Sequence, residues 1–225
     1  MQGLQVMKVL ITGANGQLGH ELVRAAIASG HEVVATSHET LDITDKSAVD
    51  AAITAARPDV VIHAAAWTAV DACESDPDKA LLVNGTATKY VVDAAHAVGA
   101  HVVYISTDYV FDGNKTSGYD EGDTPNPQSV YGSSKLAGER ALGTNDAIVR
   151  IAWVCGFYGA NMVKTILRLA EQPQLKFVDD QIGNPTFADD AAEMIVRIAT
   201  EKRSGAWHVT NQGDVSWYEF AREVW

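Results

Sequence analysis

The chain has 225 residues, of which 47% are hydrophobic and 20% charged, which is enough for one domain with a sizeable core and a smaller attached lobe. The formal net charge is −12, and the acidic residues are scattered along the chain. This argues against a nucleic-acid binder, because affinity for a phosphate backbone needs a clustered Lys/Arg surface. A small anionic ligand stays compatible, since backbone amides can bind phosphates locally.

The sequence also argues against membrane insertion, secretion and metal binding. No apolar run approaches the roughly 18 residues of a membrane span, and Met1 to Gln5 lack the basic and apolar regions of a secretory signal. Cys73 and Cys155 show no CxxC spacing, and the histidines show no metal-ligand spacing. We therefore expect a cytoplasmic protein with two reduced thiols, no metal site, and no membrane or nucleic-acid partner.

Short apolar strands alternate with amphipathic helices from the N-terminus to residue 151, as in a parallel sheet covered on both faces. In chain order, strands are expected at residues 9–11, 33–35, 60–62, 102–105 and 148–151. Helices are expected from Leu18 to Ala26 and from Ala80 to Val98, each followed by a glycine. The pattern predicts an α/β fold with a doubly wound, Rossmann-like parallel sheet whose ligand lies beyond the carboxyl ends of the strands.

Two further segments are rich in Gly, Pro and Asn. The first runs from about Phe111 to Ser129, follows the fourth strand directly, and is expected to be a functional loop. The second, Gly183 to Pro185, precedes a helix expected from Asp189 to Glu201. Beyond Ala152 helices and short strands mix, which predicts a smaller lobe packed on the sheet.

We expect a nucleotide-binding domain at residues 1–151 and a substrate-binding lobe at residues 152–225. Ser216 and Glu219 have the capping-box spacing of a helix start. Because this helix reaches only Trp225, the lobe is expected to be truncated.

Residues 13–19 read Gly-Ala-Asn-Gly-Gln-Leu-Gly and lie between the first expected strand and the first expected helix. Gly13 allows the tight turn, Gly16 lets a pyrophosphate approach the backbone, and Gly19 lets helix and strand pack closely. The helix start offers unpaired N–H groups and a positive dipole end to the phosphates. An ordinary turn is the alternative, but the context favours a nucleotide site, with contacts expected from Gly13, Asn15, Gly16, Gln17 and Leu18.

The end of the second strand, Thr36-Ser37-His38, lacks the carboxylate that binds the ribose 2′-hydroxyl of NAD and repels a 2′-phosphate. NADPH and NADH are both compatible; NADP is weakly favoured, although no Lys or Arg replaces the acid. Ser37 is expected near this ribose, and Asp42 with Ile43 at the adenine edge. A turn or helix-capping role for Asp42 is an equal alternative.

Tyr131 and Lys135 are expected to be neighbours on one helix face, because they are four residues apart. An adjacent ammonium would lower the phenol pKa from its usual value of about 10, so that the pair could give a proton to a carbonyl that accepts hydride. Thr107 ends the fourth strand, where its hydroxyl could bind the same carbonyl. This spacing alone usually marks a surface contact, so the prediction depends on the glycine turn, the hydroxyl and the pair occurring in this order.

These features resemble the extended short-chain dehydrogenase/reductase superfamily. Within it the chain is similar to the dTDP-4-dehydrorhamnose reductase family, and the similarity covers essentially the whole chain. The segments that carry it are Thr12–Gly19, Leu41–Asp45, His63–Asp71, Ser106–Gly113, Tyr131–Lys135, Arg150–Val154 and Asp180–Thr186. Residues 106–113 and 181–186 are the more specific of them.

The resemblance implies an oxidoreductase that uses NAD(P)H to reduce the C4 ketone of dTDP-6-deoxy-L-lyxo-4-hexulose to dTDP-L-rhamnose. It implies Tyr131 as proton donor, Lys135 as the residue that tunes it and holds the nicotinamide ribose, and Thr107 as the residue that orients the ketone. Cofactor contacts are implied for Ala64, Ala65 and Ala66. Substrate contacts are implied for Thr68, Val70, Asp108, Tyr109, Phe111, Trp153 and Asn184. Tight packing for the alanines, a core position for Trp153 and a turn cap for Asn184 are the alternatives.

Two other functions stay open. One is a nucleotide-sugar epimerase or dehydratase of the same superfamily. The other is a non-catalytic, NADP-binding regulatory subunit of an S-adenosylmethionine synthetase, since relatives of this reductase serve in that role. The presence of Thr107, Tyr131 and Lys135 favours an enzyme. A homodimer is compatible with the sequence, whereas a Mg²⁺ requirement has no support in it.

Overall fold

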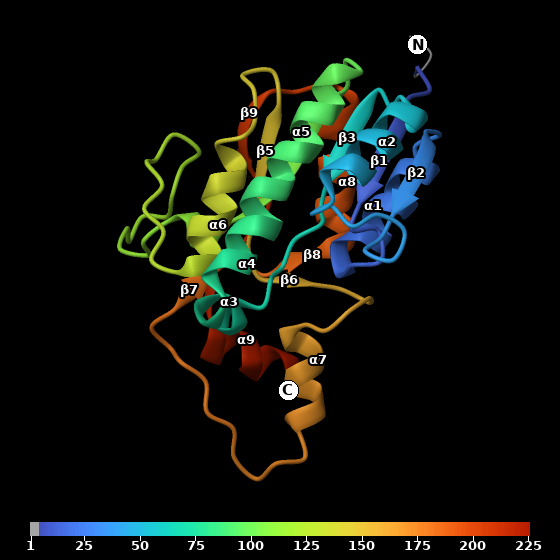
Figure 1. The fold of residues 1–225 in the computed structure, drawn as a ribbon. Coiled ribbons are helices and arrows are strands. Elements are labelled where there is room, and N and C mark those ends of the chain that lie inside the picture. The colour runs from blue at the N-terminus through green and yellow to red at the C-terminus, as the bar shows by residue number, and fades with distance from the viewer. Residues whose placement is uncertain (1–4) are drawn as a thin grey trace.

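The computed structural model describes residues 5–225 as a six-stranded parallel sheet with helices on both faces and a smaller part below it (Figure 1). The expectation that Met1 to Gln5 form no secretory signal falls mostly on residues 1–4, which lie outside the described residues. The strand order is β2-β1-β3-β4-β5-β9. The strands are β1 (Lys8–Thr12), β2 (Glu32–Thr36), β3 (Val60–His63), β4 (His101–Thr107), β5 (Ala147–Ile151) and β9 (Gly205–His208).

Helices cover both faces of this sheet, so the predicted doubly wound α/β fold is confirmed. They are α1 (Gln17–Ala28), α2 (Lys46–Ala56), α3 (Val70–Ser75), α4 (Pro77–Leu81), α5 (Ala87–Ala97), α6 (Val130–Glu139), α7 (Met162–Leu169), α8 (Ala188–Thr200) and α9 (Trp217–Val224). A π-helical segment, η1 (Leu82–Thr86), joins α4 to α5, and a 3₁₀ turn, η2 (Asp108–Val110), follows β4. Within residues 5–225, no helix is both long and apolar enough to cross a membrane.

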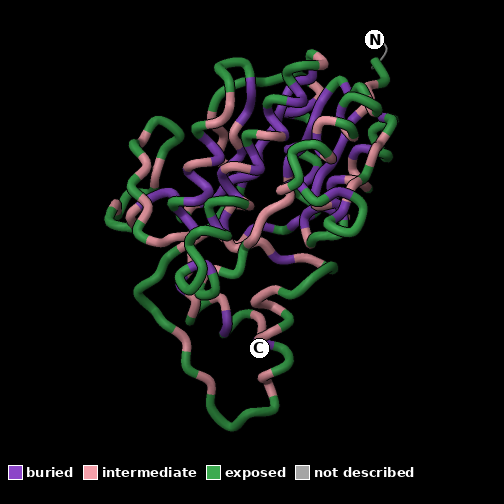
Figure 2. Tube along the Cα trace, in the orientation of Figure 1, coloured by how far each residue is buried: buried purple, intermediate pink, exposed green. Residues whose placement is uncertain are grey.

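The core lies on both sides of the sheet, because successive side chains of a strand point to opposite faces. Val9 and Ile11 of β1 pack in the cluster that includes residues of α1 and α8, whereas Leu10 packs with residues of α2 and α5. All three side chains are fully buried. Figure 2 shows the buried residues concentrated in the sheet and its covering helices. Burial on both faces explains why the strands read as continuous apolar runs.

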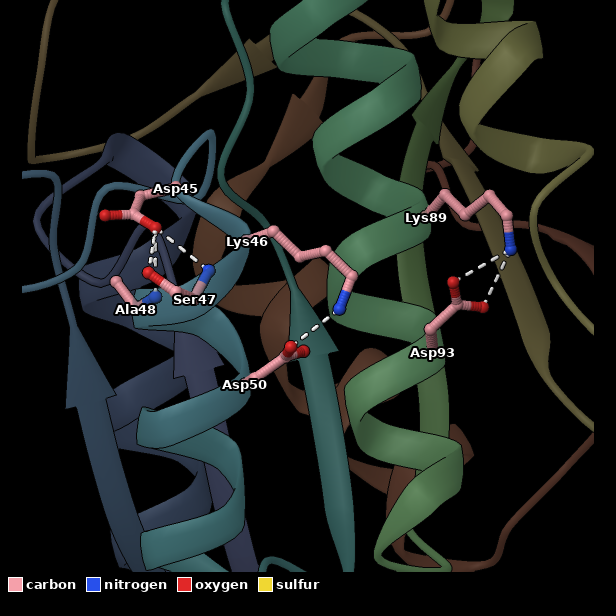
Figure 3. A network of polar contacts seen from close by, with 7 residues as sticks. All are labelled: Asp45, Lys46, Ser47, Ala48, Asp50, Lys89 and Asp93. Carbon is pink, nitrogen blue, oxygen red and sulfur yellow. Dashed lines mark hydrogen bonds and ion pairs between the residues drawn. The ribbon is translucent and has the colours of Figure 1, made fainter.

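Helices α2 and α5 carry ion pairs on their outer faces, and α2 begins at a side-chain cap. Asp45 caps α2 by accepting a 2.9 Å hydrogen bond from the Ser47 N–H (Figure 3). Lys46 and Asp50 form an exposed ion pair at 2.6 Å one turn apart, and α5 carries a second pair of this kind. Such exposed pairs contribute little stability. Their value for the fold is to keep this face in water while the opposite face packs on the sheet.

The helix expected over Ala80–Val98 exists, but the π-helical segment η1 interrupts it. This segment buries Asn84 and Gly85 against α6. A Cβ atom at Gly85 would lie 3.1 Å from Cβ of Ala137, so the glycine lets α6 approach closely. π-helical turns of this kind concentrate at functional sites.

The part of the chain after residue 151 does not form one separate lobe. Strand β9 pairs in parallel with β5, and α8 packs against α1, so both belong to the main α/β layers. Residues 205–208 read Gly-Ala-Trp-His. Because this segment lacks the apolar run of a central strand, the sequence pattern did not predict β9. We call the remaining elements the C-terminal lobe. They are α7, α9, the parallel pair β6 (Val154–Cys155) with β8 (Thr186–Phe187), and the antiparallel pair β7 (Ile182–Gly183) with β10 (Val215–Ser216).

Candidate active site

The glycine turn after β1 packs against the segment that leaves β3. Gly13 has φ +69°, and a Cβ atom there would lie 2.7 Å from the Ala65 nitrogen. Gly16 is exposed and stands at the N-cap of α1, where no side chain accepts from the first-turn N–H groups. Asn15 is also exposed, whereas Leu18 is buried in the core. The turn therefore leaves the first-turn N–H groups of α1 without a side-chain cap, which is the arrangement that the motif needs for binding an anion.

A buried histidine that the sequence analysis did not single out supports this turn from below. The Nδ1 atom of His63 lies 2.7 Å from Oγ1 of Thr12, which also accepts a hydrogen bond from the Ala65 N–H. Its Nε2 atom lies 3.2 Å from Oγ1 of Thr88, whose hydroxyl donates to the Asn84 carbonyl. Because the Thr88 proton is used there, its oxygen accepts from Nε2–H of His63, and Nδ1 accepts from Thr12. Burial lowers the pKa of His63 to about 3, which keeps the ring neutral.

The predicted Tyr131/Lys135 pair lies on the buried face of α6, facing the end of β4. Lys135 Nζ donates a 2.7 Å hydrogen bond to the Ile105 carbonyl and lies 4.1 Å from the centre of the Tyr104 ring. Burial lowers the pKa of Lys135 to about 7, and the Glu139 carboxylate opposes that shift. A surface contact between Tyr131 and Lys135 is thereby excluded, because both side chains are buried.

The expected lowering of the Tyr131 pKa by Lys135 is wrong. Burial raises the pKa of Tyr131 well above its ordinary value, and the neighbouring Asp108 carboxylate raises it further, while a hydrogen bond with Thr107 opposes the shift. The Lys135 ammonium is directed at the Ile105 carbonyl and does not offset the burial of the phenol. The raised pKa keeps Tyr131 protonated, which is the state that a proton donor requires.

The end of β4 brings several predicted residues around Tyr131. The Thr107 hydroxyl donates to Oδ1 of Asp108 at 2.9 Å and accepts from the Tyr109 N–H at 3.2 Å. The Tyr109 ring meets the Tyr131 ring edge-on, with centroids 5.6 Å apart. Val70 packs in the same small apolar cluster as Tyr131. Burial raises the pKa of Asp108.

Asn84 is a second residue that sequence reasoning missed. Its Nδ2 atom donates to Oγ of Ser134 at 2.9 Å and to the Trp67 carbonyl at 3.0 Å, and its Oδ1 atom accepts from the Trp67 N–H at 2.8 Å. These bonds tie the segment after β3, which carries the exposed Thr68, to α6. Periodicity gives no signal for this, because the π-helical segment shifts the residue out of helical register.

Three predicted substrate residues are engaged in contacts of their own. Phe111 is buried, stacks on Tyr119 with centroids 4.2 Å apart, and lies 4.9 Å from the Arg150 guanidinium carbon. Trp153 has φ +45° and stacks on Trp217 of α9 at 3.5 Å. Nδ2 of Asn184 donates to the carbonyl oxygen of Gly213 at 3.1 Å. Trp153 is half-buried, so its stacking on Trp217 does not decide between a core position and a substrate contact, and Asn184 joins two loops of the C-terminal lobe.

The predicted adenine side shows a turn. Oδ1 of Asp42 accepts hydrogen bonds from the N–H and the hydroxyl of Thr44, at 2.9 and 2.7 Å, which is the turn role named as its alternative. The Ile43 side chain is buried in the core, so only its backbone can face a ligand. Ser37 is buried, and its N–H donates to Oγ1 of Thr40 at 2.9 Å.

Cys73 and Cys155 are buried free thiols. Among residues 5–225, no group of three or more His, Cys, Asp or Glu side chains is placed to hold a metal ion.

The parallel sheet, the uncapped glycine turn and the Thr107/Tyr131/Lys135 arrangement define an oxidoreductase of the extended short-chain dehydrogenase/reductase superfamily. The family described as "RmlD substrate binding domain" matches residues 7–225. The chain therefore belongs to this family, among whose relatives dTDP-4-dehydrorhamnose reductases recur.

Individual relatives agree with this placement. Spore coat polysaccharide biosynthesis protein SpsK of Bacillus subtilis (strain 168) is 44% identical, over 96% of this chain and 78% of that protein. dTDP-4-dehydrorhamnose reductase of Aggregatibacter actinomycetemcomitans is 42% identical, over 95% of this chain and 76% of that protein. The crystal structure of dTDP-4-dehydrorhamnose reductase from Bacillus anthracis str. Ames in complex with NADP matches with a TM-score of 0.94 and 41% identity, covering 98% of this chain and 80% of that one.

Proposed function

We propose that this protein reduces the C4 ketone of dTDP-6-deoxy-L-lyxo-4-hexulose to dTDP-L-rhamnose with NADPH or NADH. The observation that carries the proposal is a buried, protonated Tyr131 on α6, with Thr107 at the end of β4 beside it and Lys135 one turn further along α6. The reductases among the relatives support the choice of substrate class. The cytoplasm is the compartment we infer for a nucleotide-linked substrate of this kind.

The chain has a cradle that fits a dinucleotide. A Cβ atom at Gly13 would collide with Ala65, and Gly16 adds no side chain above the uncapped start of α1, so a pyrophosphate has room and N–H donors there. The residues that would hold the cofactor are Gly13, Asn15, Gly16, Gln17, Leu18, Ser37, Ala64, Ala65, Ala66 and Lys135. When bound, the nicotinamide supplies a hydride to the ketone carbon. Ser37 and His38, the two residues directly after β2, carry no carboxylate to repel a 2′-phosphate, so we favour NADPH over NADH.

The side chains around β4 would then move the proton. Tyr131 gives its hydroxyl proton to the C4 oxygen, and the Lys135 ammonium would stabilise the resulting phenolate once it turns from the Ile105 carbonyl toward the phenolate. The Thr107 hydroxyl, which now donates to Asp108, can turn to donate to the same oxygen. The phenolate finally recovers a proton from water.

We also propose that the cofactor-binding and substrate-binding parts of the chain are not separated by a single boundary at residue 151. Residues 1–151 together with α8 and β9 would bind the cofactor, because these elements share one sheet and core. The C-terminal lobe would contact the sugar nucleotide.

The test is to follow NADPH absorbance with the purified protein and the dTDP-linked 4-keto sugar, and to identify dTDP-L-rhamnose by chromatography. The expected result is NADPH oxidation that depends on the sugar. NADPH binding without turnover would refute the proposal. Oxidised nicotinamide carried through purification would instead identify an epimerase or dehydratase.

A further inference from the structure

A buried ion pair lies one helical turn beyond Lys135, on the same face of α6. Oε2 of Glu139 accepts a 2.7 Å hydrogen bond from Nη2 of Arg150, and Oε1 accepts from Nε of Arg150 at 2.9 Å. Oε1 also accepts a 2.6 Å hydrogen bond from the Ser106 hydroxyl. The three residues come from α6, β5 and β4, and all are almost fully buried.

The register of these contacts links the pair to the site. Lys135 and Glu139 are one helical turn apart on α6. Lys135 donates to the carbonyl of Ile105, and Glu139 accepts from the side chain of Ser106, the next residue of β4. Thr107 is the next residue and the last of β4. Lys135 and Glu139 are therefore bound to two successive residues of β4, immediately before Thr107.

A buried ion pair is a weak means of gaining stability, because removing both charges from water costs about as much as their attraction returns. Apolar side chains of similar size would fill the same space. The three hydrogen bonds to the Glu139 carboxylate fix both the distance and the orientation of α6 relative to β4 and β5, whereas apolar packing does not fix orientation. We propose that Glu139, with Arg150 as its counter-ion, is a positioning residue that holds Tyr131 and Lys135 in register with Thr107. This inference rests on the proposed reductase activity.

The charges around Lys135 make the proposal measurable. The titratable or charged groups that face it are His63 from β3, Tyr104 from β4, Tyr131 and Glu139 from α6, and, beyond Glu139, Arg150 from β5. His63 and both tyrosines are neutral, so Glu139 is the anion of this set. Loss of its charge lowers the pKa of Lys135 further, and the ammonium needed beside the phenolate is lost at a lower pH.

The test uses Glu139→Gln, the double variant Glu139→Gln/Arg150→Met, and Ile53→Val as a control. The double variant removes both charges of the ion pair and so leaves no unpaired Arg150, and we expect it to fold even if Glu139→Gln alone does not. Ile53 is fully buried in α2, within the other core cluster, and its truncation lowers stability without touching the site. For Glu139→Gln we expect kcat to fall roughly 10- to 100-fold and the alkaline limb of its pH profile to move down by about 1 pH unit.

The double variant separates positioning from stability. We expect it to melt near the wild-type temperature and still to lose most of kcat, whereas Ile53→Val melts lower with an unchanged pH profile. A double variant with wild-type kcat and pH profile would overturn the proposal.

A second readout needs no turnover. The ¹³Cε resonance of Lys135 in the NADP⁺-bound protein reports the titration of its amine, and we expect its midpoint to fall in Glu139→Gln. An unchanged midpoint would also overturn the inference, even if the wild-type protein failed to reduce the sugar, which would refute the proposed function alone.

Discussion

The side-chain amide of Asn161 donates a 2.8 Å hydrogen bond to Oε1 of Gln17, across 144 positions of sequence. Gln17 is the first residue of α1, and Asn161 is the N-cap of α7 in the C-terminal lobe. The Nε2 atom of Gln17 donates to the Val154 carbonyl at 2.9 Å. The side chain of Gln17 thereby joins the glycine turn to the C-terminal lobe.

Asn161→Ala should loosen the C-terminal lobe without unfolding the sheet. The variant removes the link to Gln17 and the cap that accepts from the Lys164 N–H, a change that typically costs about 1 kcal/mol. We expect faster hydrogen exchange in α7, unchanged exchange in β1 and β4, and a weaker affinity for NADPH. Asp45→Ala removes a similar cap from α2 and is the control. Equal affinity for NADPH in both variants would argue against the coupling.

Gly13→Ala should abolish NADPH binding, because the new Cβ would meet both an unfavourable backbone conformation and the Ala65 nitrogen at 2.7 Å. Gly118→Ala is a matched control. Gly118 has φ +75°, yet nothing lies within 4 Å of the position that a Cβ atom would take there, so the variant carries only the conformational strain. Fluorescence titration with NADPH measures the difference. If Gly118→Ala weakened binding as much as Gly13→Ala, contact with Ala65 would not be the cause.

Tyr131→Phe should lower the rate of ketone reduction by about 10²- to 10⁴-fold while the affinity for NADPH stays nearly unchanged. The phenylalanine keeps the packing against Val70 but carries no proton for the ketone oxygen. Steady-state kinetics and NADPH titration give the two quantities. Tyr218→Phe, on the exposed face of α9, is the control. If the protein were a non-catalytic regulatory subunit of an S-adenosylmethionine synthetase, neither variant would change its activity or its affinity for NADPH.

Local sequence patterns predicted the elements whose structure is determined by local chemistry. The apolar runs, the glycine turn and the Ser216/Glu219 capping box all form as expected, because propensity and capping act over a few residues. The position of Thr107 at the ligand side of the sheet also follows from the sequence, since parallel strands end at one edge of a sheet.

What the sequence could not reveal depends on contacts between distant segments. Strand β9 is defined by its pairing with β5 and not by its composition. The π-helical turn around Asn84 forms where α6 crosses closely, and the neutral state of His63 follows from burial between Thr12 and Thr88. Residue types alone gave no reason to place either residue beneath the site.

His63 should make the protein less stable toward acid within a defined pH range. Its pKa is 6.5 when exposed and about 3 in the folded protein, so below pH 6.5 the unfolded chain binds a proton that the folded chain refuses. Stability is therefore fully present above the unfolded pKa and decreases as pH falls from 6.5 toward 3, by at most about 1.4 kcal/mol per pH unit. Chemical denaturation at several pH values measures this slope.

His63→Gln should be less stable than the wild type at about pH 8, because the ring bridges Thr12 and Thr88, but it should lose less stability between about pH 7 and pH 5. If His63→Gln kept the wild-type slope, the acid sensitivity would come from other groups. If its slope flattened and NADPH binding weakened as well, the same histidine would be shown to hold the Ala65 segment against the glycine turn.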